Sequence, residues 1–271
     1  MLELLQYEFI RNAILAAFLA SVACGIVGVY VVVNRIVFLS DGISHAAFGG
    51  LGLGCFLGLN PIYSAVAFSI AVAVGVGASS KKLGAREDTV IGVMWALGMA
   101  VGIVFIKLTP GYVPELFSYL FGNILTVPRS DLLVMLVLDI ILVLIVALFF
   151  KELLAISFDR EFAQTLRLPV NLIHSILLTL VAITVVMLIR VVGVILVMAL
   201  LTIPAAVSEI FTKRLFHVML GAVAFSLLFT LLGLWLSYLT NLPSGATIVL
   251  LASAVFFLTL LYGRKVRRLG S

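Results

Sequence analysis

The chain has 271 residues, of which 64% are hydrophobic and only 11% are charged, and its mean hydropathy is +1.32. Soluble domains contain about 45–50% apolar and about 25% charged residues, so this composition excludes a soluble globular protein. We therefore predict an all-α polytopic membrane protein. The net charge of +5 is interpreted through the positions of Lys and Arg between spans, and no nucleic-acid partner is expected.

Apolar segments long enough to cross a bilayer as helices recur along the whole chain. They predict about nine transmembrane helices. The alternative is eight, because the second segment is rich in glycine and holds a charged pair. In chain order the segments are 11–33, 38–57, 62–79, 90–108, 131–150, 172–189, 193–211, 217–238 and 246–262.

The basic residues are distributed unevenly between the polar breaks. The breaks after the first, third, fifth, seventh and ninth segments hold 13 of the 17 Lys and Arg residues. Because basic residues accumulate on the cytoplasmic side of a membrane, these breaks are predicted to be cytoplasmic. The N-terminus is then outside and the C-terminus inside.

Two of the breaks are longer than a turn. Residues 109–130 are predicted to lie outside and to form a short amphipathic helix against the outer mouth. Residues 151–171 are predicted to lie inside, where Asp159 can cap a helix with an apolar stripe of Phe162 and Leu166. This stripe needs a surface to cover it, which can be a partner protein or the inner leaflet of the membrane.

Asp41 and His45 stand four residues apart in the apolar, glycine-rich segment 38–55. On a helix this spacing brings the carboxylate, the imidazole and the Ser44 hydroxyl close to one face. An ionisable residue at membrane depth is costly and by default marks a substrate path. Carboxylate oxygen with imidazole nitrogen suits divalent transition metals. The pair is thus a candidate metal transit site, and the alternative is a hydrogen-bonded pair that fixes the span to a neighbour.

Two ligands are too few for a closed metal site, so the remaining ligands must come from another span or another subunit. Such a deficit suits a path, which must bind its cargo weakly enough to release it. Asp139, in the middle of the fifth segment, is a weaker candidate for the same path. For this residue the sequence favours a packing partner in a neighbouring helix.

Six stretches, in order along nearly the whole chain, resemble the permease subunits of zinc, manganese and iron ABC importers. The chain is also distantly similar to the permeases for vitamin B12 and siderophores, without their first span. The resemblance implies a type II ABC importer-like fold, with residues 1–271 forming one transmembrane permease domain and 151–171 its cytoplasmic coupling loop. The six stretches are Leu39–Gly49, Arg86–Gly92, Tyr119–Leu125, Ser157–Ala163, Gly193–Ala206 and Leu242–Leu250.

This resemblance implies a multi-pass protein of the prokaryotic inner or plasma membrane that imports a divalent metal ion as its substrate. The chain is then a transport subunit and not an enzyme, with no permanently bound cofactor, because ATP is hydrolysed by a separate partner. The implied partners are a second copy of the chain, two cytoplasmic ABC ATPase subunits, an extracytoplasmic metal-binding protein and the lipid bilayer.

The resemblance also implies roles for individual residues. Asp41 and His45 match the translocation path of the family, and residues 158–168 match the coupling helix that docks in a groove of the ATPase. Two positions depart from the family pattern, namely Arg167, where glycine is expected, and Asn241, where an acid is frequent. The coupling residues implied are Asp159, Glu161, Phe162, Ala163 and Leu166.

Two other kinds of transport remain as alternatives. A permease for a metal chelate or cofactor would need a wider and less charged lumen, which the Asp41 and His45 pair argues against. A free-standing secondary metal carrier would be supported by inverted-repeat halves with matching broken helices, and no convincing pairing of this kind is visible. An intramembrane enzyme is disfavoured because the chain has no recognisable nucleophile and base arrangement.

Overall fold

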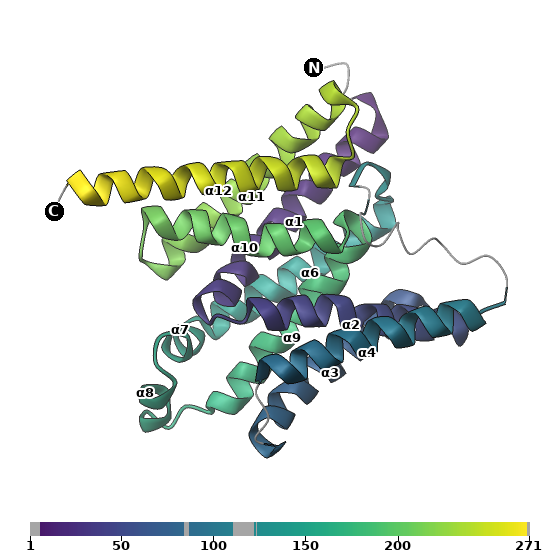
Figure 1. Ribbon diagram of the computed structural model, residues 1–271, viewed down its shortest axis with the longest axis horizontal. Coiled ribbons are helices and arrows are strands. Elements are labelled where there is room, and N and C mark those ends of the chain that lie inside the picture. Colours follow the sequence, from purple (N-terminus) through teal and green to yellow (C-terminus); the bar gives the residue numbers. More distant parts are fainter. Residues whose placement is uncertain (1–5, 84–86, 111–121, 123, 270–271) are drawn as a thin grey trace. The chain divides into compact units, whose positions relative to one another are not determined.

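The structure is a computed structural model that describes residues 6–83, 87–110, 122 and 124–269, with the backbone alone for 76–83, 87–88, 190 and 262–269. Within these residues the regular structure is helical and contains no strand (Figure 1). The helices are α1 (Glu8–Val33), α2 (Val37–Phe56), α3 (Pro61–Leu83), α4 (Glu87–Leu108), a 3-10 turn (Ile124–Thr126), α6 (Arg129–Leu148), α7 (Phe150–Phe158), α8 (Arg160–Thr165), α9 (Val170–Val192), α10 (Val194–Phe211), α11 (Leu215–Thr240) and α12 (Ser244–Leu269).

A helix lies at each of the predicted apolar segments, so the all-helical class is confirmed. In the described part of the chain, seven helices are long and apolar enough to cross a membrane, namely α1, α4, α6, α9, α10, α11 and α12. The described apolar part of α3 is shorter, Pro61–Gly75, and α2 carries Asp41 and His45. The count of nine spans therefore stays a prediction.

The chain forms two compact units. The first contains residues 1–32, 120–144 and 191–271, and thus most of α1 and α6 together with α10, α11 and α12. The second contains residues 33–119 and 145–190, and thus α2, α3, α4, α7, α8 and most of α9. Each unit is described separately below.

The first unit is organised around three mutually packed helices, α10, α11 and α12. Each contributes one fully buried residue to a shared cluster, Val207, Phe229 and Ala252. At the other end of this unit, the buried Asn12 side chain donates a hydrogen bond to the Val127 carbonyl over 3.2 Å. That bond fixes the start of α1 to the segment that precedes α6.

In the second unit, α2 packs closely against both α3 and α4. Small residues allow this approach, because a Cβ atom added to Gly98 of α4 would come within 2.6 Å of the Ala46 Cα of α2. A Cβ added to Gly50 of α2 would lie equally close to the Ala65 Cα of α3. Small residues at helix contacts are how membrane helices bring their backbones together, and here they fix how α4 lies along α2.

The predicted cytoplasmic loop 151–171 contains more helix than the sequence indicated. The amphipathic helix α7 follows α6 after the single residue Phe149 and buries Leu153 and Ile156. It is followed by α8, a helix of six residues. The predicted outer helix cannot be compared, because residues 111–121 and 123 lie outside the described part of the chain.

Candidate functional site

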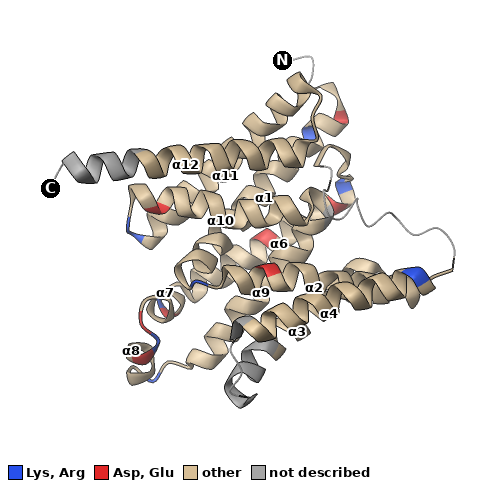
Figure 2. Ribbon diagram, in the orientation of Figure 1, with Lys and Arg blue, Asp and Glu red and all other residues tan. Residues whose placement is uncertain are grey.

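Acidic residues lie within the apolar helices α2 and α6 (Figure 2). In α2 this residue is Asp41, in the second turn of the helix. Its Oδ1 atom lies 3.5 Å from Nε2 of His45, one helical turn further on. The side chains of His45 and Asp41 remain 17% and 23% exposed, respectively. The pair predicted from the i, i+4 spacing is therefore formed, and both side chains are partly buried.

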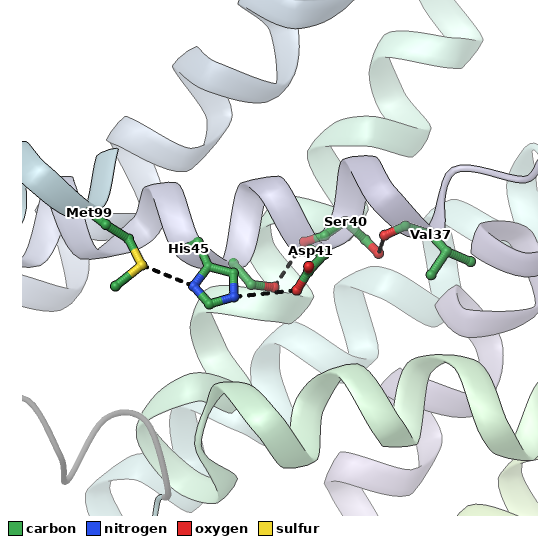
Figure 3. A network of polar contacts seen from close by, with 6 residues as sticks. Val37, Ser40, Asp41, His45 and Met99 are labelled. Carbon is green, nitrogen blue, oxygen red and sulfur yellow. Dashed lines mark hydrogen bonds and ion pairs between the residues drawn. The ribbon is translucent and has the colours of Figure 1, made fainter. Parts of the chain in front are cut away.

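The neighbouring helix α4 supplies two residues that contact the imidazole. Trp95 stacks on the His45 ring, with ring centroids 4.4 Å apart and an interplanar angle of 17°. Met99 places its Sδ atom 3.2 Å from Nδ1 of the same ring (Figure 3). Sequence reasoning missed both residues, although their own i, i+4 spacing mirrors that of Asp41 and His45.

The roles of the two imidazole nitrogens depend on the tautomer of His45. With its proton on Nε2, the ring can donate to the Asp41 carboxylate. With its proton on Nδ1, the ring donates to the Met99 sulfur, a weak acceptor, and the Nε2 lone pair faces the Asp41 carboxylate. In that state Oδ1 of Asp41 and Nε2 of His45 would be the two atoms that hold a divalent metal ion. The arrangement can thus hold a divalent cation between the two side chains.

Other polar groups near this pair do not complete a ligand set. The Ser44 hydroxyl is fully buried and donates to the Ser40 carbonyl over 2.8 Å, while Ser40 donates to the Val37 carbonyl. The spacing had suggested that Ser44 lies on the same face as Asp41 and His45. Its hydroxyl is instead buried, whereas the side chains of Asp41 and His45 remain partly exposed. Among the described residues, no group of three His, Cys, Asp or Glu side chains could hold a metal ion.

Asp139, the weaker path candidate, belongs to the other compact unit and lies within α6. It is buried, with 4% of its surface exposed, and neither carboxylate oxygen has a hydrogen-bond partner among the described residues. Burial of Asp139 is consistent with the packing against a neighbouring helix that the sequence favours, although no described residue donates a hydrogen bond to its carboxylate. A buried acid without a partner is costly, and it remains a candidate for contact with a cation.

The helix N-cap predicted at Asp159 is confirmed. Asp159 is the N-cap residue of α8, and its Oδ1 accepts a hydrogen bond of 2.9 Å from the Phe162 amide. Phe162 and Leu166 are 57% and 55% exposed, whereas Ala163 is fully buried. Glu161 is exposed as well. An apolar surface of two large side chains thus faces outward beside charged groups.

The backbone at the end of α8 shows why glycine is expected at position 167, where this chain has arginine. The Leu168 amide donates to the Ala163 carbonyl and the Arg167 amide donates to the Gln164 carbonyl, which together form a Schellman motif. Arg167 occupies the left-handed position of this motif, with φ of 57°, where glycine is the usual residue. Asn241, the other departure, ends α11 in the same conformation with φ of 55°, which asparagine tolerates well.

Arg167→Gly is therefore expected to strengthen this cap. The change removes the steric cost of a left-handed non-glycine residue, about 1–2 kcal/mol. Part of this stabilisation is offset because glycine increases the conformational entropy of the unfolded chain. A net gain of about 0.5–1 kcal/mol should slow hydrogen exchange of the amides of residues 167 and 168 by about two- to fivefold. Arg167→Val serves as the comparison and should accelerate exchange. Faster exchange in the glycine variant would contradict this account.

Comparisons with known proteins give one consistent result. The model of the ABC 3 transport family matches residues 6–263. The chain is 47% identical over 264 residues to an uncharacterized membrane protein of Synechocystis, covering 97% of this chain and 94% of that protein. It is 34% identical over 262 residues to the manganese transport system membrane protein MntC of Listeria monocytogenes, covering 97% and 93%. The structure of PsaBC from Streptococcus pneumoniae in complex with Fab matches with a TM-score of 0.86 and 30% identity, covering 94% of this chain and 92% of that chain.

Proposed function

The chain belongs to the ABC 3 transport family, and we propose that it is the membrane permease subunit of an ATP-driven importer for a divalent transition-metal ion. The observation that carries this proposal is the pair of Asp41 and His45, which face each other over 3.5 Å in a helix with no other ionisable Asp, Glu, Lys, Arg or His residue. In this reading the chain supplies the path and does not hydrolyse ATP, which is the task of a separate partner.

The geometry around the pair suits brief binding of a passing ion. Each protomer offers two ligands, and the second imidazole nitrogen contacts the weakly accepting sulfur of Met99 instead of a carboxylate. A carboxylate in that position would raise the basicity of the imidazole and tighten metal binding. A path needs weak binding to release its cargo. Asp139 is a secondary candidate for the same path.

Among divalent ions we propose manganese as the first cargo to test. The name of the Listeria relative assigns manganese transport to that protein, and another relative, from Streptococcus gordonii, is a manganese import system permease protein with 31% identity. Imidazole and carboxylate accept manganese, zinc and ferrous iron alike, so the proposal of manganese rests on the relatives and not on the ligand set.

The test is transport by the reconstituted complex. The full chain, an ABC ATPase and a metal-binding protein are placed in sealed vesicles, and radiolabelled manganese, zinc and ferrous iron are offered singly and in competition. We expect ATP-dependent uptake of the free ion, with manganese preferred. Uptake of a siderophore or cobalamin in place of any free ion would overturn the proposal in favour of a chelate permease. Uptake without the ATPase would instead indicate a secondary carrier.

We further propose that both compact units form one permease domain over residues 1–271, which spans the membrane nine times and pairs with a second copy. Two cytoplasmic ABC ATPases would dock on the α8 regions of the pair, and an extracytoplasmic metal-binding protein would deliver the ion. The family membership and the exposed apolar surface of Phe162 and Leu166 support the docking of the ATPase in this proposal.

The proposed orientation, with the N-terminus outside and the C-terminus in the cytoplasm, can be tested with single cysteines. Ser130 and Gln164 are both exposed and lie on opposite sides of the membrane in this topology. After replacement of Cys24 and Cys55, an impermeant thiol reagent added to sealed cells should label Ser130→Cys and miss Gln164→Cys. The reverse labelling pattern would invert the orientation.

A further inference from the structure

A cavity of about 310 Å³ lies within the second unit, at the corner between α1 and α2. It is bounded by residues that begin α2, end α7, and begin α8 and α9. Phe158 and Arg160 line it at the start of the proposed coupling segment, but Asp41, His45, Phe162 and Leu166 do not. The function proposed above assigns no ligand to this cavity.

The polar side of the cavity includes two arginines, together with Asn34, Ser157 and His174, and contains no carboxylate among its described lining residues. Arg35 and Arg160 line it, and Nη2 of Arg160 lies 3.0 Å from Nδ1 of His174. A guanidinium carries five N–H donors and no acceptor, so this contact holds Arg160 in place and uses only a small part of its donor capacity. The cavity therefore has a positive electrostatic character.

The start of α2 adds to this character. Ile36, the N-cap residue of this 20-residue helix, provides no side-chain hydrogen bond to the first amides. Ile36, Phe38 and Leu39 line the cavity, so the first turn of the helix adjoins it. An uncapped helix N-terminus presents unpaired amides and a positive dipole end, which favour an anion.

The other side of the cavity is apolar and open. Phe38 and Phe158 line it and remain 70% and 67% exposed, respectively. Large exposed aromatic side chains beside two arginines are suited to a ligand that has an anionic group and an apolar chain. An inorganic anion would leave the two aromatic rings without a contact.

We propose that this cavity binds the phosphate group of an anionic phospholipid, with Arg35 and Arg160 on the phosphate and Phe38 and Phe158 along the acyl chain. The inference rests on the proposed function in one respect, because the proposed orientation places Arg35 and Arg160 at the cytoplasmic leaflet. That leaflet carries anionic lipids that attract basic residues close to the membrane.

The test measures lipid binding to the purified full-length protein by native mass spectrometry, with phosphatidylglycerol and phosphatidylcholine added separately. We expect phosphatidylglycerol to bind preferentially and Arg35→Gln to weaken its binding about tenfold, the loss of one charge-assisted contact. Arg35→Lys should retain most of the binding. Arg214→Gln, which removes an exposed arginine of the other unit, is the matched control and should bind normally.

Arg35→Gly separates loss of charge from loss of fold. Arg35 has a φ of 57°, so glycine relieves backbone strain while removing the guanidinium, and lipid binding should fall as it does in Arg35→Gln with no fall in Tm. Equal phosphatidylglycerol binding by wild type and Arg35→Gln would overturn the proposal.

Two competing occupants give distinct results. Displacement of the lipid by an equal concentration of inorganic phosphate would identify a free-phosphate site and overturn the lipid assignment. Weaker co-purification of the ATPase by Arg35→Gln, with unchanged lipid binding, would identify a protein contact and overturn it as well. Because lipid binding is measured without metal or ATP, failure of the uptake experiment would leave its result unaffected.

Discussion

Replacing either Asp41 or His45 with alanine is expected to lower ATP-dependent metal uptake by about 100-fold or more at limiting metal. Removal of an outer-shell partner of a metal ligand typically costs about 10- to 100-fold. Each of these changes removes one of the two proposed direct ligands, so the loss should be larger. The measurement is the initial rate of radiolabelled ion uptake into vesicles that contain the complete transporter.

The dependence on metal concentration distinguishes a transit ligand from a structural residue. For His45→Ala the deficit should be smaller at saturating metal, because mass action can fill a weakened site, and the amount of ATPase that co-purifies should be unchanged. Asp131→Asn, which changes an acid in the first turn of α6, is the control and should transport normally. Near-normal uptake by both alanine variants at limiting metal would remove the path assignment.

The juxtaposition of Asp41 and His45 was predictable because both residues belong to one helix, whose geometry alone places positions i and i+4 together. The contacts of Trp95 and Met99 with His45 were not predictable in this way. They depend on how far α4 is shifted along α2, and that register is set by close contacts such as Gly98 with Ala46. A single sequence shows the small residues but does not show which pairs of them meet.

Residues 149–167 also show which local features could be predicted from the sequence and which could not. The cap at Asp159 followed from local chemistry and is present in the structure. The separate helix α7 was missed because no glycine or proline near Phe149 marks the end of α6, so the apolar run gave no sign of a break. Arg167 could be recognised as unusual from the family pattern, but the reason, a left-handed φ, required the backbone.

Phe162→Asp is expected to uncouple the permease from its ATPase. Phe162 is 57% exposed on α8 beside Leu166, and burial of a phenylalanine side chain in a partner groove stabilises a complex by about 1.5–3 kcal/mol. Losing about 2 kcal/mol corresponds to a fall in affinity of about 30-fold, and the new carboxylate adds a desolvation cost. We expect the ATPase to be lost during purification, or to hydrolyse ATP without driving metal uptake.

A second phenylalanine provides a matched control for this experiment. Phe216, in the first turn of α11, is 56% exposed, so Phe216→Asp makes the same chemical change at the same exposure, outside α8. Because it leaves the surface of Phe162 and Leu166 intact, the ATPase should co-purify in full with this variant. If α8 instead lies on the inner leaflet, Phe162→Asp should weaken membrane anchoring and keep the ATPase bound. Full ATPase retention with intact transport in Phe162→Asp would exclude a coupling role for this helix.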